Sequence, residues 1–469
     1  FKNYILSLVL VLSNFLVSAQ ELFSPAGTSV STSTVVFEYA IGDVIVGSNI
    51  NSNFQVTQGF SQPRSSSATV WTGAVNSDWN NPGNWSAGIP NNTDDIVISG
   101  GGNNPVINTA GAACKNLTIS SGGSITISDA SYSMNLDTLK IENGAQVTIS
   151  NGAVYLNNII NSGTLNISGG TLDIDDNYTA SGNVNTNIPG GTIKVEGNWT
   201  SSGSGFDPTG GTVESSGSVA QTISLAAGNN FYDLKINNSH ASNKVSAQGS
   251  ALVVSNHLNI ADGIFESASD YHDVTIASGS TLELTGDITV SGDWTNNGTF
   301  TAGTYGVTFD GSTAQSISGS NTFYDLTINN LNSDISLGYV GPSLNFQFQN
   351  HLNLLQGNIN LNTNTLEFYS ITNYSNAGSY SHIYNGYCYR YYNSVTSFTY
   401  PIGDGTSYRP ITLTSSNFGT NSLSAAYMFA TQNQSLLNSS LSSIETYGWD
   451  IQRSTGSDGF NITIPFDAS

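Results

Sequence analysis

Short alternations of apolar and polar residues dominate the chain from about residue 96 to residue 360. A pair such as Leu117 and Ile119 places two apolar side chains on one face of a strand of about five residues. Turns rich in Gly, Asn and Ser, such as residues 142–144, separate these strands. No helical periodicity is sustained over three turns in this region. The pattern therefore predicts an all-β structure.

Strands this short, joined by turns of three or four residues, do not suit long hairpins. They suit a coil in which each strand pairs with its equivalent one turn later, with the apolar side chains stacked inside. We therefore predict a right-handed parallel β-helix, or solenoid, over residues 99–360. An array of β-sandwiches is the alternative, and it is less favoured because such domains carry longer strands and turn signals every 8 to 12 residues.

A long block within this region occurs twice. Its first copy covers residues 197–265 and its second covers residues 292–359. Three motifs recur in order, with offsets of 95, 92 and 94 residues: Gly197-Asn198-Trp199-Thr200 with Gly292-Asp293-Trp294-Thr295, Phe231-Tyr232-Asp233-Leu234 with Phe323-Tyr324-Asp325-Leu326, and Asn256-His257-Leu258-Asn259 with Asn350-His351-Leu352-Asn353. Such a duplication indicates a stacked, elongated structure rather than a globule around one pocket.

The segment 71–98 is dense in tryptophan and in turn-forming residues. Trp71, Trp79 and Trp85 lie within 15 residues of one another. We predict that they form a structural cap over one end of the stack, because an exposed end strand offers bare backbone groups to other chains. A platform of aromatic rings for carbohydrate is the alternative interpretation.

The composition changes on both sides of the predicted solenoid. Residues 20–63 form a short N-terminal β segment with predicted strands at 35–43 and 54–60, and residues 64–70 read as a linker. Residues 361–469 are rich in tyrosine and predict a separate antiparallel, sandwich-like β domain that is cut short. Its first tyrosines are Tyr369, Tyr374, Tyr380, Tyr384, Tyr387, Tyr389, Tyr391 and Tyr392.

The N-terminus has the pattern of a secretory signal peptide over residues 1–19. A basic residue is followed by an apolar stretch and by small residues that predict cleavage between Ala19 and Gln20. An uncleaved membrane anchor is the alternative, but the stretch is short for a bilayer span. Because the sequence begins with Phe1 and stops within an apparent strand, we expect it to be a fragment of a longer protein.

Charge and cysteine content narrow the classes of partner. Acidic residues outnumber basic residues by 32 to 10, which gives a net charge of −22. So few cations cannot neutralise many phosphates, so we expect no nucleic-acid partner, and we expect no membrane insertion after removal of the signal.

Cys114 and Cys388 lie far apart in the sequence, and we expect two separately buried thiols rather than a disulfide.

Candidate catalytic chemistry is sparse. No arginine lies between Arg64 and Arg390, which argues against a lyase cleft for anionic sugars. Asp173 and Asp175 share a strand face and are the one candidate carboxylate pair for a hydrolase, although a solvated acidic edge is the favoured interpretation. The histidines lack the spacing of a metal site. We therefore predict no catalytic residue, no cofactor and no metal site.

Three segments resemble elements of secreted proteins from Bacteroidetes: the sequence at 57–63, the tryptophan-rich segment, and the sequence at 398–413. The tryptophan-rich segment also resembles the start of large autotransporter-like β-helical surface proteins. This resemblance implies an adhesin-like protein that is secreted or held on the outer cell surface, exported by the type IX route.

The leading functional expectation is a non-enzymatic, rigid spacer. Its expected partners are extracellular glycans or other cell-surface components, contacted weakly and many times over. The alternative is the accessory or scaffold region of a polysaccharide-degrading enzyme whose catalytic module lies outside this fragment. In that case the outward tyrosines, such as Tyr389 and Tyr391, are a candidate sugar platform.

Overall fold

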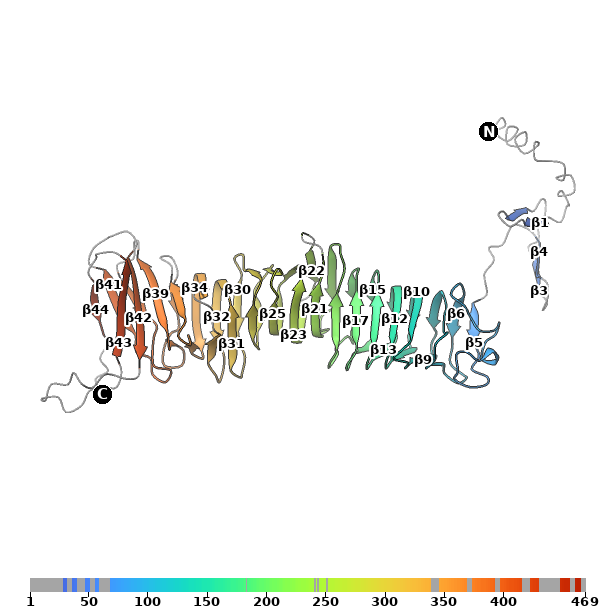
Figure 1. Cartoon of the computed structure of the whole chain (residues 1–469), viewed down its shortest axis with the longest axis horizontal. Helices are drawn as coiled ribbons and strands as arrows, with labels where there is room; N and C mark the ends of the chain where they lie inside the picture. The colour runs from blue at the N-terminus through green and yellow to red at the C-terminus, as the bar shows by residue number, and fades with distance from the viewer. Residues whose placement is uncertain are drawn as a thin grey trace, which may run out of the picture. The chain divides into compact units, whose positions relative to one another are not determined.

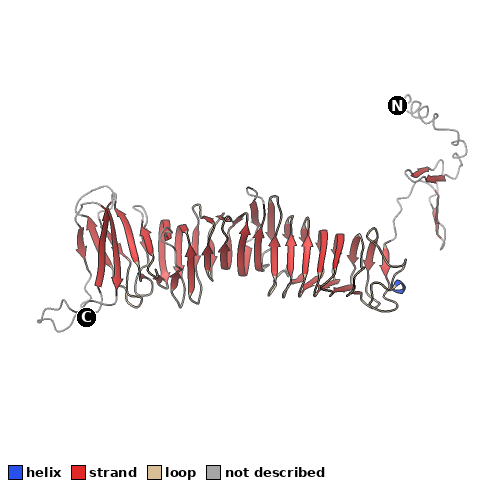
Figure 2. Ribbon diagram, in the orientation of Figure 1, coloured by secondary structure: helices blue, strands red, loops and turns tan. Residues whose placement is uncertain are grey.

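The computed structural model describes residues 28–31, 36–39, 47–50, 55–58, 68–182, 184–239, 242, 244–249, 252–338, 346–368, 373–392, 397–415, 422–429, 448–455 and 460–464. The predicted signal peptide, with Ala19 and Gln20, lies outside these residues. The chain divides into two compact units, Phe1–Ala68 and Thr69–Ser469. The described elements are strands (Figure 2), apart from the short 3-10 helix η3 (Pro82–Asn84).

The first unit contains two antiparallel strand pairs. Strand β1 (Thr28–Ser31) pairs with β2 (Val36–Tyr39), and β3 (Gly47–Ile50) pairs with β4 (Gln55–Gln58). The strands β2 and β4 fall within the two segments predicted from the sequence.

The second unit is a parallel β-solenoid with its strands stacked one beside the next (Figure 1). The strand pairings arrange them in three columns around one core. Column A contains β5 (Thr69–Trp71), β6 (Asp95–Ile98), β8 (Asn116–Ile119), the second halves of β10 (Ser133–Ile141) and β12 (Ala153–Asn161), β15 (Tyr178–Ala180), β18 (Trp199–Ser201), β20 (Gln221–Leu225), β22 (Lys244–Gly249), β24 (Ile264–Ser267), β26 (Thr281–Leu284) and β29 (Thr299–Thr301).

Columns B and C are built in the same way. Column B contains β7 (Val106–Ile107), β9 (Ser124–Ile127), β11 (Gln146–Ile149), β13 (Thr164–Ile167), β16 (Asn185–Asn187), the first halves of β21 (Phe231–Asn237), β23 (Leu252–Asp262) and β25 (Ser269–Ile276), then β27 (Ile288–Val290) and β30 (Gly306–Phe309). Column C contains the first halves of β10 and β12, β14 (Thr171–Ile174), β17 (Thr192–Val195), β19 (Thr212–Ser215), the second halves of β21, β23 and β25, then β28 (Trp294–Asn296), β31 (Gln315–Gly319), β33 (Ile335–Leu337), β35 (Ile359–Asn360) and β38 (Ile383–Tyr384).

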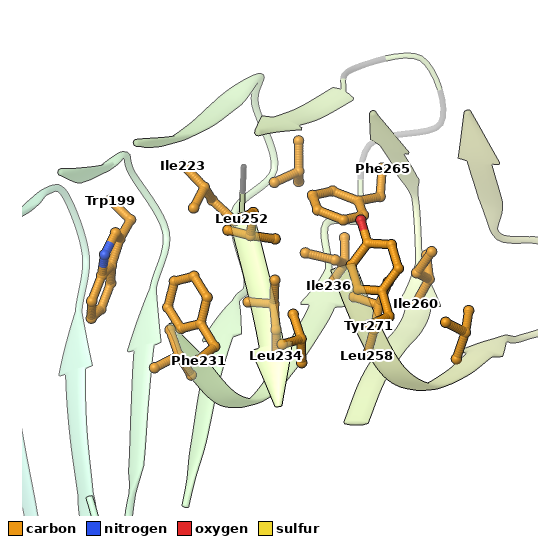
Figure 3. Close-up of a cluster of buried hydrophobic side chains, with 14 of the residues drawn as sticks. Trp199, Ile223, Phe231, Leu234, Ile236, Leu252, Leu258, Ile260, Phe265 and Tyr271 are labelled. Atoms are coloured by element: carbon orange, nitrogen blue, oxygen red, sulfur yellow. The ribbon is translucent and has the colours of Figure 1, made fainter. Parts of the chain in front are cut away.

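The alternating pattern explains the core. In most of the short strands every second residue points inward and is buried, as in β8, where Leu117 and Ile119 are both enclosed. Aromatic rings fill the centre of the first sequence copy, where Trp199, Phe231 and Phe265 point into the core (Figure 3). The structure thus confirms the predicted all-β parallel solenoid with an antiparallel sheet at its C-terminal side.

The parallel stacking continues beyond residue 360, where the sequence analysis placed the end of the solenoid. The strands β32 (Asn321–Asn329) and β34 (Phe346–Gln356) each span columns A and B, and β34 is followed by β36 (Thr365–Phe368) and β39 (Tyr387–Tyr392) in column A and by β37 (Asn373–Ser375) in column B. The boundary at 360 was therefore wrong. Leu366, Phe368 and Cys388 extend the buried ladder within a tyrosine-rich segment.

The predicted starting boundaries also need correction. The parallel column already includes β5 and β6, which lie before residue 99. At the other end, β39 pairs antiparallel with β42 (Ser422–Phe429), and β42 pairs with β43 (Gly448–Thr455). A second antiparallel sheet contains β40 (Ser397–Tyr400), β41 (Ile411–Ser415) and β44 (Phe460–Thr463).

The two sequence copies occupy different faces of the solenoid. Trp199 lies on β18 in column A, whereas its equivalent Trp294 lies on β28 in column C. Column A passes from β18 through β20, β22 and β24 to β26, which is four turns, and β28 follows two columns later. The duplicated unit therefore spans four turns and two columns, and the second copy is rotated by one column about the axis.

A buried glutamine fixes each copy in the same way. In the first copy, Gln221 Nε2 donates to the carbonyls of Val195 and Gly197 at 2.9 and 2.7 Å. Its Oε1 accepts from Gly217 N at 3.2 Å and from Asn238 Nδ2 at 2.8 Å. We call this set of four bonds the amide clamp. It joins three successive turns through groups that are enclosed in the core.

The amide clamp recurs in the second copy with nearly the same distances. Gln315 Nε2 donates to Val290 O and Gly292 O at 2.9 and 2.7 Å. Its Oε1 accepts from Gly311 N at 3.1 Å and from Asn330 Nδ2 at 2.9 Å. The duplication thus preserves internal hydrogen bonding although the two copies face different directions.

Candidate functional site

The three tryptophans of the predicted cap pack against one another beside the first strand of the solenoid. The Trp85 ring meets Trp71 and Trp79 edge-on, with centroids 4.8 and 4.7 Å away. Trp85 Nε1 donates to Trp79 O at 2.7 Å, and Trp71 Nε1 donates to Asn103 O at 2.6 Å. All three side chains are buried. They therefore offer no open ring face to a sugar.

The same segment covers the outer edge of β5. Thr72 N donates to Asn84 O at 2.7 Å, and Ser86 N donates to Val70 O at 2.9 Å. Trp71 and Trp85 form an antiparallel bridge, so residues 84–86 run back along β5 on the side away from β6. This geometry is what an end cap requires, because it occupies backbone groups that otherwise invite another strand. The capping role itself stays a prediction.

The candidate carboxylates Asp173 and Asp175 lie outside the core, but Asp173 belongs to a row of alternating charges. In column C its neighbour on the next strand is Lys194, and the Lys194 Nζ to Asp173 Oδ2 distance is 4.0 Å. The row continues with Glu214 and Lys235, which are 3.3 Å apart. Asp173 is thus the first member of a row of alternating acidic and basic side chains on the outward side of column C.

The acidic segment carries two perturbed carboxyls. Burial raises the pKa of Asp173, Lys194 opposes that rise, and Asp175 adds to it. Burial followed by the charges of Asp175 and Asp173 raises the pKa of Glu196 on the next turn. Both pKa shifts therefore arise first from burial and then from the neighbouring acids on stacked turns. They do not by themselves define a hydrolytic site.

The two equivalent histidines of the duplicated unit contact residues of neighbouring strands. His257 Nε2 lies 2.9 Å from Thr275 Oγ1, and His257 is paired with Asp233 on the neighbouring strand. His351 pairs in the same way with Asp325 in the second copy. No group of three metal-ligating side chains that fits a metal ion occurs in the described ranges. His240 lies outside the described residues.

Cys114 and Cys388 are free thiols and are both buried, as predicted. Burial raises the pKa of both thiols well above the ordinary range, and the carboxylates of Asp95 and Asp94 add to the shift at Cys114. Burial thus disfavours the reactive thiolate form of both cysteines.

Among the described residues, the open grooves on the surface of the solenoid include three that contain polar side chains. The first, with a volume of about 290 Å³, contains Lys115, Asp137 and Tyr155, whose side chain is 41% exposed. The second, of about 520 Å³, lies beside the tryptophans and contains Asp78 and Asn108. The third, of about 280 Å³, contains Asp334 and Tyr380, and we call it the Tyr380 groove.

Sequence reasoning did not single out Tyr380, which it grouped with the other C-terminal tyrosines. The structure separates them. Tyr387 and Tyr389 lie half-buried on the outward side of β39, with ring centroids 6.1 Å apart, whereas Tyr380 is 85% exposed on a turn. The side chain of Tyr391 lies outside the described set. The available signal for Tyr380 was its position as an isolated ring among the small residues Gly378, Ser379 and Ser381.

These features define the class of protein: a parallel β-solenoid with a covered first strand, a packed aromatic core and open polar grooves. The chain belongs to the family described as domain of unknown function DUF8693, which matches residues 70–407. No curated protein and no solved structure matches the chain. Among the described residues, no helix has the length and apolar character needed to cross a membrane.

Proposed function

We propose that the second unit is a rigid, non-enzymatic spacer in an adhesin-like protein that is secreted or displayed on the outer cell surface. The observation that carries this proposal is the parallel stacking that continues, through at least one column at every turn, from β5 to β39. These strands lie at opposite ends of the solenoid (Figure 1). A stack of this kind holds whatever is attached to its two ends at a fixed separation.

Two features support stiffness. The core is filled along its length with interlocking rings and aliphatic side chains, which resist bending because close-packed interiors deform little. The amide clamps of Gln221 and Gln315 each tie successive turns together through buried hydrogen bonds. Extracellular placement is supported by the signal-like N-terminal sequence and by the strongly acidic composition.

The experiment uses whole cells of the source organism. A Thr406→Cys substitution introduces an exposed thiol near the C-terminal side of the solenoid, while Cys114 and Cys388 stay unreactive because they are buried. The thiol is labelled on intact cells with a dye that cannot cross membranes. Energy transfer to a dye in the outer lipid surface is then measured for this protein and for a variant that lacks residues 197–291.

We expect labelling of intact cells and stronger energy transfer in the shortened variant. Labelling that appears only after lysis overturns the surface placement. Equal energy transfer in the two proteins overturns the spacer role, because a rigid spacer shortened by more than four turns must bring its far end closer to the membrane.

The scaffold of a polysaccharide-degrading enzyme is the second candidate, and one observation favours it. Tyr387 and Tyr389 lie half-buried on the outward side of β39 as neighbouring rings, with centroids 6.1 Å apart. Retention of the Tyr389→Ala variant on immobilised polysaccharide tests this candidate. Unchanged retention removes Tyr389 from any platform.

A further inference from the structure

The Tyr380 groove is built by three successive turns at the corner between columns B and C. These turns connect β32 to β33, β34 to β35, and β37 to β38. Backbone hydrogen bonds hold the turns in register: Asn330 N donates to Gln356 O, and Gly357 N donates to Tyr380 O, both at 3.0 Å. The groove is therefore part of the solenoid framework.

Large apolar side chains are exposed on two of these turns, at Leu331 and Tyr380, and near the end of β34, at Leu355. Leu331 is 62% exposed, Leu355 is 42% exposed and Tyr380 is 85% exposed. Burying one such side chain is worth about 1.5–3 kcal/mol, and here that free energy is not used by the fold. Leu331 and Tyr380 both line the groove, so exposed apolar surface lies beside polar groups there, as in a ligand site.

The turn that carries Tyr380 is held firmly. Gly378 and Ser381 exchange backbone hydrogen bonds of 2.8 and 3.2 Å. Ser381 Oγ donates to Gly357 O at 2.7 Å, and His382 Nδ1 lies 3.2 Å from Gly378 O. The base of the ring is thus fixed before any ligand arrives, which lowers the entropic cost of binding.

The polar groups of the groove divide into fixed and available ones. Asp334 accepts from Tyr384 Oη at 2.8 Å and from Asn358 N at 3.3 Å, so its carboxylate is positioned by the protein. The side-chain amides of Asn332 and Gln356 also line the groove, and neither forms a hydrogen bond within the described part of the chain. They supply donors and acceptors to a ligand.

The charge of the groove restricts its ligand. Asp334 is the one charged residue among the groove residues, which otherwise are amides, hydroxyls, a leucine and a glycine. No Lys or Arg is among them to pair with a carboxylate, sulfate or phosphate. A peptide strand is not favoured either, because the groove is formed by closed turns rather than by an open sheet edge.

We propose that the Tyr380 groove binds a saccharide that lacks acidic groups. The apolar face of a sugar ring would rest on Tyr380, while its hydroxyls bond the amides of Asn332 and Gln356 and the carboxylate of Asp334. The exposed ring of Tyr380 thus matches the apolar face of a sugar, and the side-chain amides match its hydroxyl groups. The proposal does not depend on the spacer role, because a groove on a solenoid binds equally well in isolation.

The test measures binding of the purified chain to a panel of neutral, amino and acidic oligosaccharides. We expect binding to neutral or amino sugars, and a loss of about tenfold or more in affinity for Tyr380→Ala. Tyr380→Phe should bind like the unaltered chain, because the ring face is kept. Tyr155→Ala, which removes an exposed ring from a different groove, is the matched control and should have no effect.

Three outcomes overturn the proposal: no binding to any neutral or amino oligosaccharide, a preference for acidic sugars, or binding that Tyr380→Ala leaves unchanged. Tyr380 is 85% exposed, so the alanine variant should keep the melting temperature of the unaltered chain. Equal melting temperatures separate lost binding from lost folding. The energy-transfer experiment on cells is independent of this result, so either proposal can fail alone.

Discussion

Trp199 and Trp294 occupy equivalent sequence positions but have different hydrogen bonding. The indole Nε1 of Trp294 donates to Asn321 Oδ1 at 2.7 Å. The indole Nε1 of Trp199 is buried and has no hydrogen-bond partner, because the equivalent Asn229 bonds Gly203 O and Phe206 N instead. A buried donor without an acceptor costs about 1–3 kcal/mol. The pair therefore compares a buried indole with and without a hydrogen bond, although Trp199 also stacks on Tyr178 whereas Trp294 packs against Phe300.

We predict that Trp294→Phe destabilises its turns by about 1–2 kcal/mol more than Trp199→Phe does. Both variants lose a similar volume from the core, so the difference reports mainly the hydrogen bond. Amide hydrogen exchange in the neighbouring strands gives the local free energy of opening. Equal losses at the two sites would contradict the role assigned to Asn321.

Lys244 bridges two glutamates on successive turns. Its Nζ lies 2.5 Å from Glu266 Oε1 and 2.6 Å from Glu283 Oε2. Hydrogen bonding to Lys244 lowers the pKa of Glu266 below its ordinary value of 4.5, and the two carboxylates raise the pKa of Lys244. The bridge therefore joins acids that otherwise repel each other along the stack.

We predict that Lys244→Met lowers the melting temperature at pH 7 and that this deficit shrinks below about pH 4.5. A carboxyl whose pKa is lower in the folded state than in the unfolded state stabilises the folded protein at pH values above its unfolded-state pKa. This stabilisation is lost as the pH falls through the folded-state pKa. Lys140→Met, which removes an exposed ion pair with Glu142, is the control and should change little. A deficit of equal size at pH 7 and pH 3 would rule out the ionic bridge as its cause.

At the scale of the element, the tryptophan segment and β5 form one unit. Trp85 contacts both other rings and donates to Trp79 O, so it is the centre of the cluster. Each turn of a solenoid contacts mainly its neighbours, so damage at the first turn stays near that end. The predicted cap can therefore be tested without unfolding the whole stack.

We predict that Trp85→Ala costs about 3–5 kcal/mol at β5 and β6, with little change at β30 and β32. Hydrogen exchange resolves the two ends separately. Light scattering should also show association, because the outer edge of β5 becomes open to other chains. Ile89→Ala alters an exposed side chain of the same segment and serves as the control. Uniform loss along the stack, or no association, would refute the capping role.

The strands and their inward faces were predictable because side-chain alternation alone sets which residues are buried. Leu117, Ile119 and the other apolar pairs lie where the pattern placed them. The end of the solenoid was not predictable, because the many tyrosines after residue 360 obscure the apolar alternation in the sequence. Leu366, Phe368 and Cys388 nevertheless continue the buried ladder. The exposure of Tyr380 depends on how three turns stack. Sequence spacing carries no such information.

At the scale of the whole molecule, the number of turns sets the length of the solenoid, which we also call the rod. Deletion of residues 197–291 joins Glu196 to Gly292, so the second copy takes the place of the first. In the unaltered chain Trp199 follows β17 and stacks on Tyr178, with ring centroids 3.8 Å apart. In the deletion variant Trp294 follows β17 in the same way and faces Tyr178. The deletion thus removes one complete duplicated unit.

We predict a folded solenoid that is shorter by about 22 Å, from four turns and two columns at ~4.8 Å a turn. Small-angle X-ray scattering measures the maximum dimension of each purified protein. Deletion of residues 202–291 is nearly the same size but places Trp294 in the wrong column, so it should disrupt folding. A shorter rod from both deletions would contradict the assignment of columns.

The one-column rotation between the copies limits how a partner can use them. Asn256 donates to Asp233 at 2.6 Å on one side of the rod, and Asn350 donates to Asp325 at 2.7 Å on another. A receptor approaching along a single direction meets one of these matching surfaces and misses its twin. Simultaneous engagement of both requires a partner that winds around the rod, or two partners arriving from different sides. The duplication lengthens the solenoid without placing identical binding surfaces in a row along one side.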